Sequence, residues 1–139
     1  MSRAAEIDFT FFSTIQTHVA LDALAANGVS FEFEGRVTYV IDVDGMFDWA
    51  HAAPGDLQRV KESAAHAAPT TTFGITAILG ERTGGDFLFH PQRDTVSFMP
   101  EVNRRLLPDS TFCDFGWYLH RLVPVFEPFG LTKVETAEY

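Results

Sequence analysis

The sequence lacks several features that would indicate where the protein acts. It has one cysteine among 139 residues, Cys113, so no disulfide can form within the chain. No run approaches the ~20 apolar residues of a membrane span, and the first residues contain no apolar signal-peptide core. These absences predict a cytoplasmic protein.

Basic residues are also scarce. Ten lysines and arginines stand against 19 aspartates and glutamates, which gives a formal net charge of −9. Because such a surface repels phosphates, we expect no binding to nucleic acid and none to anionic membrane. A basic protein partner would be attracted instead, chiefly through a faster association.

Motifs for catalysis and cofactors are absent too. The five histidines form neither an i, i+4 metal pair nor a Cys/His zinc pattern, and no Gly-x-Ser-x-Gly motif occurs. The glycine-rich segment 80–85 lacks the Gly-Lys-Ser/Thr ending of a phosphate-binding loop. Asp114 follows Cys113 and disfavours its thiolate, so a buried structural thiol is predicted. We predict no catalytic residue, resident metal or cofactor, which argues against an enzyme without excluding one.

Apolar residues are plentiful. They make up 46% of the chain and include 14 phenylalanines, enough for the core of one α+β domain spanning residues 1–139.

Hydrophobic periodicity predicts the elements of that domain. Alternation predicts a strand at 7–11, a hairpin of strands 29–34 and 37–42 around Glu34-Gly35, three strands at 71–79, 86–90 and 95–98, and a final strand from Leu131 to Ala137. Segment 44–53 is predicted to be a loop, and 99–110 fits either a loop or a short helix.

Three helices are predicted between these strands. The first opens at a Ser13–Gln16 capping box and carries an apolar face of Ile15, Val19, Ala23 and Ala26. The second covers roughly 56–67, with Leu57, Val60 and Ala64 as its stripe. The third is capped by Asp114 and carries Phe115, Leu119, Leu122 and Phe126, with Pro124 expected to kink it or end it early.

The resulting order is β-α-β-β-α-β-β-β-α-β. Hairpins dominate it, so the predicted fold is an antiparallel or mixed sheet with about three helices packed mainly on one face. The first β-α-β unit leaves a parallel pair possible.

Two clusters combine carboxylates with aromatic rings and are the predicted partner-binding sites. The first cluster comprises Asp42, Asp44, Phe47, Asp48 and Trp49. The second comprises Asp109, Asp114, Trp117 and Tyr118. Aromatic anchors ringed by carboxylates suit a basic protein surface, whereas a solvated acidic loop and ordinary core packing are the simpler alternatives. Asp42, Asp44 and Asp48 do not have the spacing of an EF-hand loop, although oxygen ligands of this kind also suit Ca²⁺ or Mg²⁺.

Three hypotheses for function follow. The preferred one is an acidic inhibitor that docks on a basic, nuclease-type toxin, similar in general character to small immunity proteins; it assumes that the two clusters form one contiguous face. The second is a small enzyme or ligand-binding domain whose pocket is lined by Phe9, Phe31, Phe73, Phe87 and Phe89, with His90 or His120 as its polar group. The third is a subunit of a homo-oligomer that buries the exposed aromatic side chains.

Overall fold

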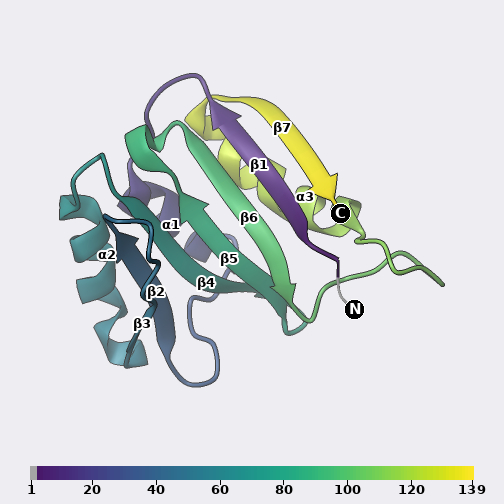
Figure 1. The fold of residues 1–139 in the computed structure, drawn as a ribbon, viewed down its shortest axis with the longest axis horizontal. Helices are drawn as coiled ribbons and strands as arrows, with labels where there is room; N and C mark the ends of the chain where they lie inside the picture. The colour runs from purple at the N-terminus through teal and green to yellow at the C-terminus, as the bar shows by residue number, and fades with distance from the viewer. Residues whose placement is uncertain (1–2) are drawn as a thin grey trace.

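A seven-stranded sheet organises the chain in a computed structural model that describes residues 3–139 (Figure 1). Its strands are β1 (Ala5–Phe11), β2 (Val37–Asp42), β3 (Ala50–Ala52), β4 (Thr72–Gly80), β5 (Thr83–Phe89), β6 (Thr95–Val102) and β7 (Leu131–Glu138). The α-helices are α1 (Thr17–Ala26), α2 (Leu57–His66) and α3 (Phe115–Phe126). No helix in this part of the chain is both long and apolar enough to cross a bilayer.

The strands lie in the order β3-β2-β4-β5-β6-β1-β7, and all neighbouring pairs are antiparallel. The predicted α+β class, the helix count and the order of helices and strands along the chain are therefore confirmed. The parallel pair left open for the first β-α-β unit does not form, because β1 lies between β6 and β7, far from β2.

Strand alternation divides the sheet into a core face and an open face. Ile7, Phe9, Phe73, Ile75 and Phe98 are fully buried on the core face. Figure 1 shows α1 and α3 behind the sheet, with α2 beside α1 at the β2 end. All three helices thus cover one face, and within residues 3–139 no helix covers the other.

The predicted strand 29–34 is wrong. In this segment only two isolated bridges form, Ser30 with Ile78 and Phe33 with Arg36. The reason is competition for β2, which pairs with β4 along one edge and with β3 along the other. β3 comes from the segment predicted to be a loop.

The predicted start and apolar face of α1 are also wrong. The helix begins at Thr17 after Gln16, which makes no side-chain capping bond, so the Ser13 capping box does not form. The helix buries Thr17, Ala20, Leu21 and Leu24, whereas Val19 is 40% exposed. Burying two leucines removes more apolar surface from water than burying alanines does, which explains the rotation of the helix.

The predictions for α2 and α3 agree better with the structure. Val60 and Ala64 of α2 are buried. Asp114 caps α3, its Oδ1 accepting from the Trp117 amide at 3.3 Å. Leu122 and Phe126 are fully buried, and α3 continues past Pro124 to Phe126 instead of ending early.

Candidate partner-binding surface

The open face of the sheet is rich in carboxylates. Glu6 and Asp8 alternate with the core residues of β1, and Glu135 of β7 lies directly opposite Asp8. Burial raises the pKa of Glu6, and the neighbouring Asp8 raises it further. Lys133 offsets part of this charge through an ion pair with Glu135 at 3.2 Å. The face therefore keeps an excess of negative charge at neutral pH.

An acidic groove lies further along the same face. It has a volume of about 540 Å³ and is lined by Phe33, Glu34, Thr76, Asp86, Glu101, Val102 and Asn103. Asp86 is held in place because its Oδ1 accepts from the Thr76 hydroxyl at 2.6 Å. Glu34 and Glu101 are exposed. Three carboxylates and no basic residue line the groove, so its chemistry suits a cationic side chain of a partner.

The loop after β2 carries the first predicted cluster. Asp42 is only 8% exposed, and its carboxylate accepts from the Gly45 and Phe47 amides, each at 2.9 Å. Asp42 therefore shapes the loop and is not available as a contact residue, which corrects its assignment to the partner-binding set. Asp44 and Asp48 are exposed as that assignment requires, and Phe47 is 37% exposed.

Trp49 anchors this loop to the sheet. A Cβ placed on Gly74 would lie 2.9 Å from the Trp49 indole, 2.9 Å from Val40 Cγ1 and 2.8 Å from Leu88 Cδ2. Only a glycine at this position of β4 leaves room for the indole. Trp49 is consequently half-buried against the open face, and the exposed apolar side chains of the loop are Val43, Met46 and Phe47.

The second predicted cluster lies at the opposite end of the sheet. Tyr118 is fully buried and its hydroxyl accepts from the Arg105 amide at 2.9 Å, so its assignment as a contact residue is wrong. The residue lies on the apolar stripe of α3, which turns it into the core. Trp117 is half-buried, with Arg121 3.7 Å from its ring centroid, and Asp114 serves as the helix cap.

The two clusters do not form one face. Figure 1 shows the loop after β2 on the left and the segment between β6 and α3, which holds exposed Asp109, protruding on the right. Four strands lie between β2 and β7 in the order of the sheet. The assumption of contiguity is therefore wrong, and only the first cluster adjoins the open face.

No protein-family model, no curated protein and no solved structure matches this chain.

A hydrogen-bonded row on the open face joins β1, β6 and the residue that follows β5. The Ser97 hydroxyl donates to Asp8 Oδ1 at 2.5 Å and lies 2.7 Å from His90 Nε2. In a serine hydrolase the imidazole stands between the serine and the carboxylate and accepts the serine proton. Here the serine occupies the middle position and donates its hydrogen bond to the Asp8 carboxylate, so His90 does not accept the serine proton and does not activate the hydroxyl. Ser97 is also only 3% exposed, and the row is structural.

Cys113 is buried and free, as predicted. Burial, followed by the nearby Glu138 carboxylate, raises the pKa of its thiol to about 11. At neutral pH the thiol is protonated and is a poor nucleophile.

The phenylalanines proposed to line a pocket form the core instead. Phe9, Phe31, Phe73, Phe87 and Phe89 are each at most 3% exposed. Phe87 packs against Phe89 with ring centroids 6.5 Å apart. The two proposed polar groups do not join them: His90 bonds to Ser97 on the open face, and His120 is exposed on α3. The pocket predicted from these residues is therefore absent.

Sequence reasoning missed the carboxylates of the acidic groove. Glu34, Asp86 and Glu101 come from a turn and from two strands, and they are up to 67 residues apart, since 101 − 34 = 67. No local motif connects them. One signal was present in the sequence, the alternation within β5. It places Asp86 on the face of the sheet opposite to that of the buried Phe87 and Phe89.

Proposed function

We propose that the open face of the sheet binds a basic protein partner, and that the protein is an inhibitor of the immunity-protein kind that blocks a nuclease-type toxin in the bacterial cytoplasm. The observation that carries the proposal is the acidic groove of Glu34, Asp86 and Glu101, on a sheet face that none of the described helices covers. A nuclease surface that binds phosphate is basic, so the same surface can dock on this face.

Physical chemistry supports the pairing. Complementary charge raises association rate constants toward ~10⁸–10⁹ M⁻¹s⁻¹ at low salt, which lets an inhibitor capture a toxin before it acts. The exposed side chains of Val43, Met46 and Phe47 add apolar contact area at one end of the face. The groove supplies charge, and the loop after β2 supplies hydrophobic anchors.

The test begins with basic proteins encoded beside this gene. Each is co-expressed with the protein, growth rescue is scored, and binding is measured by biolayer interferometry. We expect Asp86→Asn with Glu101→Gln to weaken binding at least tenfold and to act mainly on the association rate. Asp56→Asn with Glu62→Gln, two exposed acids at α2 away from the open face, removes the same charge as a matched control and should leave affinity within twofold.

Equal losses from the groove variant and from the Asp56/Glu62 control would mean that only overall charge matters, and the proposed face would be wrong. Light scattering on the isolated protein tests the alternative that copies pair with each other. A dimer that the groove variant dissociates would assign the open face to self-association and overturn the inhibitor proposal.

A further inference from the structure

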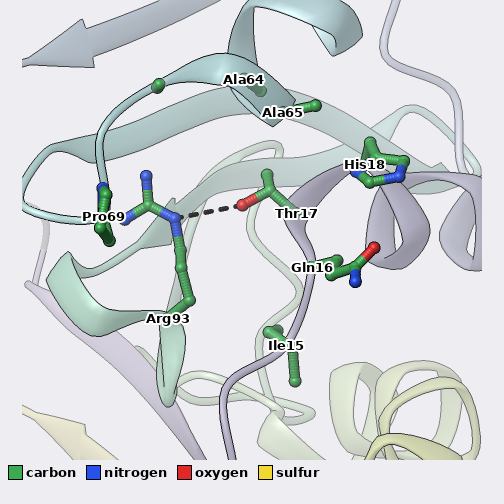
Figure 2. Close-up of a pocket in the computed structure, with 9 residues that line it drawn as sticks. Ile15, Gln16, Thr17, His18, Ala64, Ala65, Pro69 and Arg93 are labelled. Carbon is green, nitrogen blue, oxygen red and sulfur yellow. Dashed lines mark hydrogen bonds between the residues drawn. The ribbon is translucent and has the colours of Figure 1, made fainter.

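A cavity lies on the helical side of the molecule, away from the acidic groove. It has a volume of about 330 Å³ and is lined by Ile15, Gln16, Thr17, His18, Ala64, Ala65, Ala67, Pro69 and Arg93. Figure 2 shows these residues around the Arg93 guanidinium, with the start of α1 on one side and the end of α2 above. Although the chain has 19 acids, the lining contains none.

Arg93 is a buried cation with no carboxylate partner. Its exposure is 6%, and none of the ion pairs found among residues 3–139 includes it. Burial lowers the pKa of its guanidinium, which shows the cost of keeping the charge there. Desolvated charges are ordinarily paired with a charge of opposite sign.

The hydrogen bonds of the Arg93 guanidinium use all but one of its N–H groups. Nε donates to Thr17 Oγ1 at 3.1 Å, and Nη1 donates to the carbonyls of Thr71, Phe89 and His90. Nη2 carries two hydrogens and has one acceptor within the described chain, Thr71 Oγ1 at 3.2 Å. The carbonyls hold the guanidinium in place but do not neutralise it, and one Nη2 hydrogen lacks an acceptor.

The start of α1 borders the same cavity, which Gln16, Thr17 and His18 line. Its N-cap residue, Gln16, makes no side-chain bond to the turn, and the turn has no acidic residue. The intrahelical ladder begins with the Ala20 amide, so the amides of Thr17, His18 and Val19 have no intrahelical acceptor. The positive end of the helix dipole and a buried guanidinium thus converge on one cavity.

We propose that this cavity binds a small oxyanion, a phosphate or carboxylate group, between the Arg93 guanidinium and the first turn of α1. The anion accepts from the free Nη2 hydrogen and from backbone amides of that turn, and it neutralises the buried charge. This cavity is cationic, whereas the groove is acidic, and the proposed anion site goes beyond the proposed function. Either proposal can therefore be wrong without affecting the other.

Titration of the ¹⁵N-labelled protein with sodium phosphate, at ionic strength matched with sodium chloride, tests the site. We expect saturable shifts confined to the amides of Thr17, His18 and Val19 and to the Arg93 Nε–H. Parallel titrations with acetate and with phosphoserine show whether the site prefers a carboxylate, a free phosphate or a phosphate ester. Shifts that are linear and spread over the surface would overturn the proposal.

Arg93 also holds three carbonyls, so its replacement risks unfolding the protein. Ala65 provides a safer pair of variants, because it lines the cavity but is exposed on α2. Ala65→Glu places a competing carboxylate at the cavity and should raise the phosphate Kd at least tenfold. Ala65→Gln, of nearly equal volume, should change it less than threefold. An unchanged phosphate Kd in both variants would show that the anion does not bind there.

Discussion

His90 connects two chemically different parts of the molecule. It follows β5, and its Nε2 lies 2.7 Å from the Ser97 hydroxyl on the open face, while its carbonyl accepts from the Arg93 guanidinium behind. Burial lowers the pKa of His90; Asp8 acts in the opposite direction, and Arg93 lowers the pKa further. The folded protein therefore holds this imidazole neutral at pH values where the unfolded chain protonates it.

The consequence is a pH-dependent stability with a definite sign. Below the ordinary pKa of 6.5 the unfolded chain binds a proton that the folded chain does not bind. The free energy of unfolding should therefore fall as the pH is lowered from 7.5 to 5.5. Urea unfolding of the wild type and of His90→Gln at these pH values checks this, and the variant should show the flatter profile. A steeper loss in the variant would contradict the assignment.

Glu6 changes the free energy of unfolding in the opposite direction to His90, and it does so at lower pH. Because burial and Asp8 raise its pKa, the folded chain binds a proton more readily than the unfolded chain above pH 4.5. Protonation of Glu6 thus favours the fold on acidification, whereas protonation of His90 opposes it. A control profile of Glu6→Gln separates the two contributions.

At the scale of elements, the loop between β2 and β3 depends on one buried carboxylate. Asp42 accepts from two loop amides, and Gly45 and Phe47 adopt positive φ values of 83° and 50° between these bonds. Asp42→Ala would leave both amides without their acceptor, and we expect a loss of about 1–3 kcal/mol in the free energy of unfolding.

Asp44→Ala is the matched comparison in the same loop. Asp44 is exposed and accepts only from the nearby Met46 amide at 3.0 Å, so its loss should stay within about 0.5 kcal/mol. Urea unfolding measures both variants, and hydrogen exchange should show faster exchange at Gly45 and Phe47 only in Asp42→Ala. Equal destabilisation by the two variants would show that Asp42 has no special role.

The elements also show what local sequence can and cannot predict. The cap of α3 was predictable, because Asp114 bonds to an amide three residues away. The prediction of a strand at 29–34 was wrong even though the alternation of the segment is real, with Val29 and Phe31 buried. Whether the segment pairs as a strand depends on whether it or β3 occupies the edge of β2, and β3 occupies that edge. That competition is between segments about twenty residues apart and has no local signature.

The same reasoning applies to the candidate surface. The carboxylates of the first cluster were visible because Asp42, Asp44 and Asp48 lie close together in sequence. Glu34, Asp86 and Glu101 become neighbours only through the strand order, so no short motif could reveal the groove. Burial of Tyr118 was equally hidden, because it depends on which way α3 rotates against the sheet.

At the scale of the whole molecule, negative charge is only partly neutralised. The formal charge is −9, and four ion pairs form among residues 3–139, three of which involve Asp22, Asp56 and Glu81. Repulsion between the remaining carboxylates favours the expanded unfolded chain. Screening this repulsion should stabilise the fold.

We therefore expect the Tm at pH 7.5 to rise by roughly 3–5 °C between 0.01 and 0.15 M sodium chloride, as the Debye length shrinks from about 30 to about 8 Å. Calorimetry at both salt concentrations measures this rise. At pH 4.8, near the sequence pI, the net charge vanishes and the rise should vanish with it. Stabilisation that persisted unchanged at pH 4.8 would point instead to chloride in the Arg93 cavity, because that cavity remains cationic at both pH values. Comparing the two pH values thus separates repulsion spread over the surface from an anion held at one place.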